Sequence, residues 1–303
     1  LTGVKKQEYT NASTTQLVNA KTNDWDYDLI AQLGYPRDIF LPIEMPGTEV
    51  GHLSRAIQDQ VGFDCSVVLP ATHDTGSAVM AVPSLSDDTL YISSGTWSLM
   101  GTELKTANCS PDSMACNFTN EGGYDHRFRY LKNIMGLWMI QSVRKELSPD
   151  EGFGSICEHA ATETITSIVD ANDDRFLAPQ NMTAEVQAAC RESGQEVPEG
   201  IYQVAAVIYN SLARCYADTV KEIEQIEHVT YPCINIVGGG ANAAYLNELT
   251  AKATGKTVYA GPTEATAIGN IMAQMIAAGE LQDLAEARKC VFHSFEIKEE
   301  KGC

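Results

Sequence analysis

Positive charge is scarce in this sequence: 21 Lys and Arg residues stand against 40 Asp and Glu, which gives a net charge of −19. Such an acidic surface repels nucleic acids and anionic membranes, so we expect neither as a partner. No apolar run approaches the length that crosses a membrane. A nucleotide site on this chain must therefore rely on backbone N–H groups, helix N-termini and a bound cation.

Paired cysteines and hydrolase signatures are also missing. The nine cysteines are an odd number without CxxC or metal-type spacing, which predicts free thiols, a cytoplasmic location and no zinc site. There is no GxSxG motif and the six histidines are scattered, so a serine hydrolase is poorly supported. The 303 residues, 44% of them hydrophobic and 20% charged, suit two domains or one large α/β domain.

The most informative stretch contains three consecutive glycines after an apolar run. In order, it comprises a strand at 234–237, the glycines Gly238, Gly239 and Gly240, a helix, a strand at 257–259 and a helix from Thr263. This order predicts a parallel sheet with right-handed crossovers, and such sheets bind ligands at the carboxyl ends of their strands. The glycines either let backbone approach a nucleotide or form a tight structural turn. Their spacing does not match the GxGxxG motif, which disfavours a dinucleotide-binding site.

A second candidate site follows the buried strand expected at 65–69. The turn at 70–75 contains Asp74, and small residues from Gly76 on favour a helix start. A carboxylate at this place suits a general base that faces a cleft, and it equally suits a cap of the following helix. Its neighbour His73 either hydrogen-bonds a polar substrate or is a half-buried histidine with satisfied ring nitrogens.

Secondary structure can also be predicted for several further segments. A hairpin is predicted from strands at 89–92 and 97–100, so Thr96 either binds a phosphate oxygen or closes the turn. A helix expected from Lys132 places Asn133 and Gln141 two turns apart on one polar side. Apolar residues recur every four positions over 204–220, which predicts an amphipathic core helix, and the tail at 294–303 is expected to be solvated or frayed.

Together these motifs resemble the carbohydrate kinases of the FGGY family. The runs that carry the resemblance are Tyr9–Gln16, Ala71–Thr75, Tyr91–Gly101, Asn120–Gly123, Leu131–Trp138, Asn172–Phe176, Val237–Gly240 and Ala260–Thr266. They cover almost the whole chain in one order, which is far more specific than any single motif.

The resemblance implies an α/β protein of the ribonuclease H-like, actin-like ATPase fold, with a mixed sheet flanked by helices. It implies ATP-dependent phosphorylation of L-rhamnulose to L-rhamnulose 1-phosphate in rhamnose catabolism, with Mg²⁺. Asp74 is then the catalytic base, and His73, Thr75 and Asn133 contact the sugar. Thr96, Gln141, Gly238, Gly239 and Gly240 bind the nucleotide, and no metal ligand is assigned. Two alternatives remain open: a kinase for another ketose, such as fuculose or xylulose, and a non-catalytic sugar or nucleotide sensor.

The sequence departs from the family pattern in three ways. Most of the family's first lobe is expected to precede Leu1, so residues 1–62 are assigned to the end of that lobe and 63–303 to the second lobe. The family usually runs on beyond a tail of this kind, and the 303 residues alone are expected to be inactive. Relatives often place an asparagine where this chain has Ala243, and here the asparagine is Asn242.

Overall fold

The computed structural model describes residues 1–302, which form two compact units. Unit 1 consists of Leu1–Asp87, Thr102–Leu131 and Glu264–Ser294. Unit 2 consists of Asp88–Gly101, Lys132–Thr263 and the described residues from Phe295 on. Each unit is therefore assembled from segments that are far apart in the sequence. The predicted division into family lobes after residue 62 stays a prediction.

A seven-stranded mixed sheet is the largest sheet, and its strand order is β13-β12-β11-β7-β8-β10-β9. Strand β11 pairs in parallel with both β7 and β12. Three pairs are antiparallel: β7 with β8, β12 with β13, and β9 with β10. The strands are β7 (Leu90–Ser94), β8 (Trp97–Leu104), β9 (Thr119–Gly122), β10 (Phe128–Met135), β11 (Cys233–Val237), β12 (Thr257–Ala260) and β13 (Lys298–Glu300). The predicted α/β class with a mixed sheet is confirmed.

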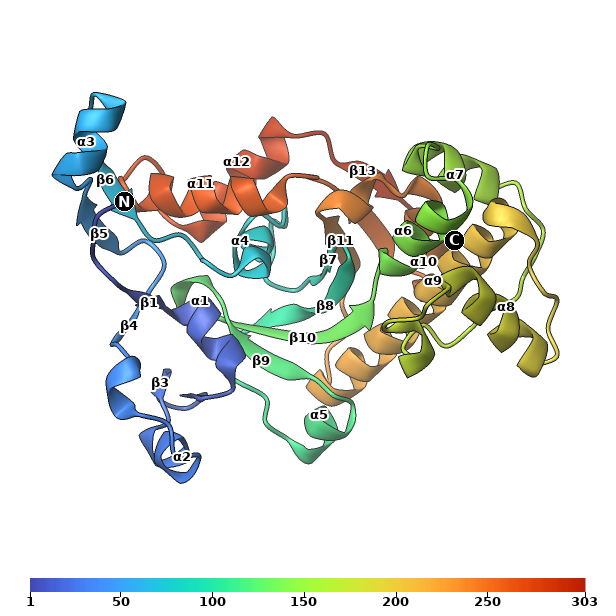
Figure 1. The fold of residues 1–303 in the computed structure, drawn as a ribbon, viewed down its shortest axis with the longest axis horizontal. Helices are drawn as coiled ribbons and strands as arrows, with labels where there is room; N and C mark the ends of the chain where they lie inside the picture. The colour runs from blue at the N-terminus through green and yellow to red at the C-terminus, as the bar shows by residue number, and fades with distance from the viewer. Residues whose placement is uncertain (303) are drawn as a thin grey trace. The chain divides into compact units, whose positions relative to one another are not determined.

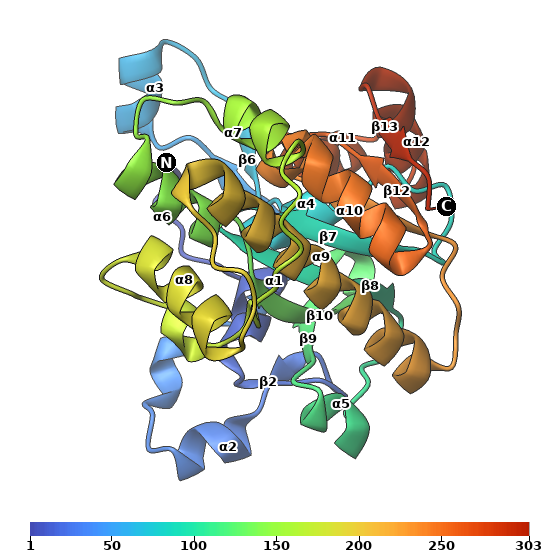
Figure 2. The ribbon, with the colours of Figure 1, turned by 90° about the vertical axis from the view of Figure 1, so that its right-hand side faces the viewer.

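Unit 2 contains the predicted strand–helix–strand segment, in which α10 (Ala244–Thr254) connects the parallel strands β11 and β12. The longest helix, α9 (Gly200–Glu227), packs against α10 and against three further helices of this unit (Figure 2). These are α6 (Trp138–Leu147), α7 (Phe153–Ala160) and α8 (Met182–Glu192). The predicted apolar stripe of α9 is buried, which confirms that it is core. No helix within residues 1–302 is long and apolar enough to cross a membrane.

Unit 1 contains three two-stranded sheets and most of the short helices. The pairs are β1 (Gln7–Glu8) with β4 (Ile43–Glu44), β2 (Val18–Asn19) with β3 (Asp24–Trp25) and β5 (Glu49–His52) with β6 (Ser66–Val68). The helices are α1 (Tyr9–Ala12), α2 (Tyr27–Gln32), α3 (Arg55–Val61), α4 (Asp74–Met80), α5 (Pro111–Ala115), α11 (Ala265–Ala277) and α12 (Leu284–Ser294). Short 3₁₀ turns occur in unit 1 at Ser13–Thr15, Arg37–Ile39 and Tyr124–His126, and in unit 2 at Asp174–Phe176 and Gly239–Asn242.

Helix α4 packs closely against α11 within unit 1 (Figure 1). A Cβ atom at Gly269 of α11 would lie 1.8 Å from the carbonyl oxygen of Ser77 in α4. Only glycine allows this approach, so the two helices touch through their backbones. The position of α4, which begins at Asp74, is thus fixed by α11.

The helix expected from Lys132 is wrong, because residues 128–135 form strand β10. Asn133 lies exposed on this strand, while Gln141 lies on α6, which starts only at Trp138. The two amides therefore do not share a helix face. A short apolar run bounded by a glycine is compatible with a buried strand as well as with a helix, and the sheet decides between them.

Two other local expectations are corrected in part. The tail is largely exposed, as expected for a solvated segment, but it is not frayed, because Lys298–Glu300 forms edge strand β13 against β12. The strand expected at 65–69 exists as β6, yet it is only partly buried because its sole described partner is β5. In both cases pairing with a distant segment, rather than local composition, decides the outcome.

A buried ion pair holds the end of α4. Arg288 donates to the carbonyl oxygens of Val79 (2.9 Å) and Met80 (3.3 Å) and pairs with Glu103. The side chains of Arg288 and Glu103 are only 4% and 9% exposed. Breaking such a pair leaves an uncompensated buried charge, which is more costly than losing a pair on the surface.

We expect Arg288→Met to lower the free energy of unfolding by about 3–5 kcal/mol, because Glu103 is left buried without its cation. Denaturation in urea, followed by circular dichroism, measures this loss. The control is Arg55→Met, whose ion pair with Asp59 is well exposed and is worth less than about 1 kcal/mol. Equal losses for the two variants would contradict the structural role of Arg288.

Candidate functional site

Asp74 is the first residue of α4 and its carboxylate is open to solvent. The preceding His73 occupies the N-cap position, and its ring Nδ1 accepts a hydrogen bond from the Thr75 N–H at 3.2 Å. Asp74 Oδ1 also accepts from this N–H, at 2.6 Å, while the Asp74 side chain is 80% exposed. The helix thus already has a cap residue in His73, and the Asp74 carboxylate keeps a solvent-facing side on which a ligand can bind.

His73 is held as a neutral ring. Burial, followed by the positive charge of Arg129, lowers its pKa below the ordinary value. Since the Thr75 N–H can only donate, Nδ1 must carry the lone pair, and the ring proton then resides on Nε2. At neutral pH His73 therefore offers a hydrogen-bond donor at Nε2.

The buried pair Arg129–Glu121 lies in the same unit as His73. Arg129 is fully buried, its Nη1 lies 2.9 Å from Glu121 Oε2, and its Nε donates to the Gly122 carbonyl at 2.9 Å. A Cβ atom at Gly122 would lie 2.6 Å from the ring of Tyr9. The Asn120–Gly123 motif is therefore explained by close packing around a buried charge pair.

The β7–β8 turn carries Thr96 and is fixed by the segment that follows β10. The carbonyl oxygens of Gly95 and Thr96 accept from the N–H groups of Leu137 (3.1 Å) and Trp138 (3.0 Å). A Cβ atom at Gly136 would lie 2.5 Å from the Trp97 carbonyl carbon. The start of α6, which carries Gln141, is thus joined to the hairpin turn, while the Thr96 side chain is exposed.

The three glycines after β11 have different surroundings. Gly238 has φ +87°, and a Cβ atom there would lie 2.8 Å from the Ser94 carbonyl oxygen. A Cβ atom at Gly240 would lie only 1.9 Å from Ser94 Oγ, whereas one at Gly239 would meet no atom within 4 Å. Gly238 and Gly240 are therefore required for packing, and Gly239 alone presents its backbone to open space.

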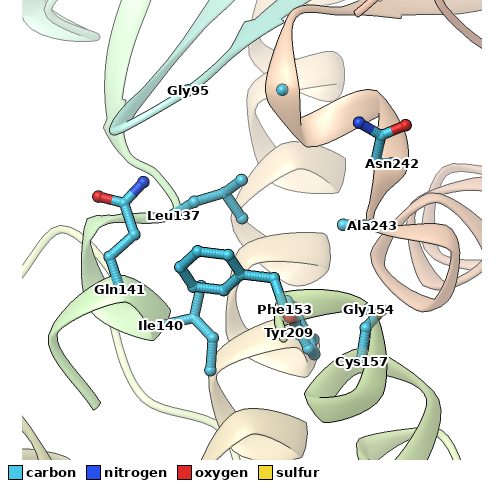
Figure 3. A pocket seen from close by; sticks show the side chains of 11 residues that line it. Gly95, Leu137, Ile140, Gln141, Phe153, Gly154, Cys157, Tyr209, Asn242 and Ala243 are labelled. Carbon is cyan, nitrogen blue, oxygen red and sulfur yellow. The ribbon is translucent and has the colours of Figure 1, made fainter. Parts of the chain in front are cut away.

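A pocket of about 320 Å³ opens at this turn within unit 2 (Figure 3). Its walls are mainly apolar and include Leu137, Ile140, Phe153 and Tyr209, with Gly95, Gln141 and Gly239 also in the lining. The structure thus brings the predicted Gln141 and Gly239 together. Of the other predicted residues, Thr96, Gly238 and Gly240 adjoin lining residues in the chain, whereas Asn133 lies elsewhere on β10. Such a pocket suits a flat, partly apolar group with polar edges.

Asn242 was not predicted as a site residue, yet it lines this pocket together with Ala243. Its Oδ1 accepts a hydrogen bond from Thr263 Oγ1 at 3.3 Å. Figure 3 shows Gln141 and Asn242 toward opposite sides of the pocket, with the Asn242 amide nitrogen on the side of the other lining residues. The shift of the asparagine by one position therefore still leaves an amide in the pocket wall.

Within residues 1–302, no group of three or more His, Cys, Asp or Glu side chains is arranged to bind a metal ion. The eight cysteines in this range are free thiols, as predicted, and Cys303 lies outside the described residues. Burial raises the pKa of Cys215 to about 11 and also raises that of the pocket residue Cys157. Both thiols are therefore protonated at neutral pH.

Sequence comparison identifies both halves of the chain. The profile of the FGGY family of carbohydrate kinases matches with its N-terminal domain over residues 1–81 and with its C-terminal domain over residues 90–278. The rhamnulokinase of Oceanobacillus iheyensis is 49% identical over 297 residues, covering 98% of this chain and 63% of the relative. The rhamnulokinase of Halalkalibacterium halodurans is 50% identical over 298 residues, covering 98% and 64%. The chain thus spans somewhat less than two thirds of these relatives.

Structural comparison agrees on the fold. The crystal structure of gluconate kinase from Lactobacillus acidophilus superimposes with a TM-score of 0.75, covering all of this chain and 61% of that one. The sequences are only 16% identical, so the similarity concerns the fold alone. It confirms the predicted actin-like fold of the sugar kinases.

Proposed function

Because the chain belongs to the FGGY family of carbohydrate kinases, we propose that its protein transfers the γ-phosphoryl group of ATP to a terminal hydroxyl of L-rhamnulose. The products are L-rhamnulose 1-phosphate and ADP. The observation that carries the choice of sugar is identity near 50% with rhamnulokinases over nearly the whole chain. Phosphorylation of another ketose is the nearest alternative.

In this proposal Asp74 is the catalytic base. Its exposed carboxylate accepts the proton of the sugar hydroxyl while that oxygen bonds to the phosphorus atom and the bond to the ADP oxygen breaks. Neutral His73 donates from Nε2 to a sugar oxygen, and Thr75 and Asn133 contact the sugar as well. The support for Asp74 is its exposure at the start of a well-braced helix.

The nucleotide is proposed to bind at the pocket of unit 2. Its apolar walls suit the adenine ring, and the Gln141 amide suits polar atoms at the edge of the nucleotide. The open backbone at Gly239 allows close approach, with Gly238 and Gly240 shaping the turn and Thr96 binding a phosphate oxygen. A Mg²⁺ ion would neutralise phosphate charge, and it commonly keeps water and phosphate ligands rather than an all-protein cage.

The test is release of ADP by the protein expressed from its complete reading frame, given Mg-ATP and a panel of ketoses. We expect turnover with L-rhamnulose at a kcat/KM at least about tenfold above that with xylulose or fuculose, since specificity reflects differential binding of transition states. The 303-residue chain is assayed alongside and is expected to be inactive.

The other outcomes are equally informative. Selective turnover of a different ketose would retain the kinase and discard L-rhamnulose as the substrate. ATP binding without turnover of any sugar, in a folded protein, would favour a sensor on the same fold.

A further inference from the structure

We propose that Glu8 is a positioning residue for Asp74: its buried carboxylate fixes the backbone immediately before Asp74 and so aims the catalytic carboxylate. This inference rests on the proposed function, because it assigns Asp74 the role of the base. Glu8 lies 64 residues from Thr72 in the sequence, but the two are in direct contact.

The Glu8 carboxylate is 4% exposed and accepts five hydrogen bonds. On the side of α1, Thr10 donates from its N–H (2.7 Å) and its hydroxyl (2.6 Å), and Asn11 donates from its N–H at 3.3 Å. On the side of the Asp74 turn, Thr72 donates from its N–H (3.0 Å) and its hydroxyl (2.6 Å). Five neutral donors thus compensate a buried charge, and two of them belong to the turn.

A second link runs through Thr10. Its hydroxyl donates to Glu8 and accepts from the N–H of His73 at 3.2 Å. Both residues before Asp74 are therefore held, Thr72 directly and His73 through one hydroxyl. On the other side, Thr266 donates to the Asp74 carbonyl at 3.3 Å.

Close packing transmits this constraint to α4. A Cβ atom at Gly76 would lie 3.2 Å from Thr10 Cβ and 3.3 Å from Ala71 Cβ, so the first turn of α4 lies directly on Thr10. The Asp74 side chain is mostly exposed, and its aim therefore depends on its backbone. A displacement near 1 Å in such a group lowers the rate by roughly 10²-fold.

Glu8 itself does not touch a substrate. Both of its oxygens accept protein hydrogen bonds and the residue is buried, so it has no path to a bound sugar. Its effect must pass through Thr72 and His73, which makes it a positioning residue and not a second base.

The primary test is Glu8→Gln in the complete protein, with kcat and both KM values measured. The glutamine nitrogen cannot accept a hydrogen bond, so part of the donor set loses its partner while side-chain size is kept. We expect kcat to fall by roughly 10–100-fold and the KM for ATP to stay within about twofold, since the nucleotide site is on other residues.

A matched control is Glu146→Gln in unit 2. Glu146 accepts from the N–H groups of Met182 (2.7 Å) and Thr183 (2.9 Å) and from the Thr183 hydroxyl (2.7 Å) at the start of α8. These hydrogen bonds resemble those of Glu8, but their donors, Met182 and Thr183, are not adjacent to any proposed site residue. We expect its Tm to fall and its kcat to remain that of the wild type.

Thr72 supplies the variants that keep the test valid if Glu8→Gln does not fold. Thr72→Val removes the hydroxyl donor and should lower kcat in the manner of Glu8→Gln. Thr72→Ser restores the donor and should restore kcat, and Thr72→Val in the Glu8→Gln background should add little.

A loss of kcat in Glu8→Gln that is no greater than in Glu146→Gln at the same loss of Tm would overturn the proposal. So would failure of Thr72→Ser to restore activity lost in Thr72→Val. If the wild-type enzyme is active, either result refutes the positioning role of Glu8 and leaves the proposed function intact. If the wild-type protein is inactive on every sugar, the proposed function itself is refuted.

Discussion

Replacing Asp74 with asparagine in the complete protein is expected to lower kcat for sugar phosphorylation by roughly 10²–10⁴-fold, the usual contribution of a general base. The amide is nearly the same size, but it cannot accept the proton of the sugar hydroxyl. The Thr75 N–H, which donates to Oδ1 at 2.6 Å, still finds an acceptor. Because the Asp74 side chain is 80% exposed, we expect stability to change by less than about 1 kcal/mol.

The measurement is kcat with saturating L-rhamnulose and Mg-ATP, together with Tm and calorimetric binding of ATP. The control is Asp112→Asn, since Asp112 is also an exposed aspartate in the first turn of a short helix. We expect Asp112→Asn to keep the wild-type kcat and Asp74→Asn to keep wild-type ATP affinity. A folded Asp74→Asn protein with more than about a tenth of the wild-type kcat would show that Asp74 is not the base.

Segments whose structure depends on local signals were predicted correctly. The strand–glycine–helix–strand order from Ile234 on, the hairpin around Gly95 and the amphipathic helix over 204–220 all form as expected. Each has a distinct turn residue or a clear period, so the type of element follows from the local sequence.

Segments whose structure depends on distant partners were not predicted. The local sequence predicts a helix at Asn133 because its apolar neighbours fit either element, whereas membership in the sheet makes the residue part of β10. Glu8 was missed because its meaning comes from Thr72, 64 residues away. A glutamate directly before Tyr9 and Thr10 looks like an ordinary surface residue until the fold buries it. A site residue that is recognised from a sequence motif, such as Asp74, is thus supported by residues, such as Glu8, that the motif does not identify.

The glycine turn provides the second large effect, because substitutions at two of its glycines are both expected to weaken ATP binding, but only one of them to lower stability. Gly240→Ala brings a Cβ atom to 1.9 Å from Ser94 Oγ and 2.4 Å from Ser94 Cβ. Ser94 is only 4% exposed and has little room to move, so the turn must shift. We expect a loss of about 1–3 kcal/mol in the free energy of unfolding and at least a tenfold rise in the KM for ATP.

Gly239→Ala is the matched comparison, because its Cβ atom meets nothing within 4 Å and its φ is not positive. The fold should tolerate this methyl group, and Tm should stay within about 2 °C of the wild type, which corresponds to about 1 kcal/mol or less. Since Gly239 lines the pocket, the methyl group would occupy space proposed for the nucleotide, and we expect ATP affinity to fall by about tenfold or more. Calorimetric titration with Mg-ATP and thermal unfolding of both variants separate the two effects. Wild-type affinity in Gly239→Ala would mean that the glycines serve only to make a tight turn, and the nucleotide would then have to bind without this backbone contact.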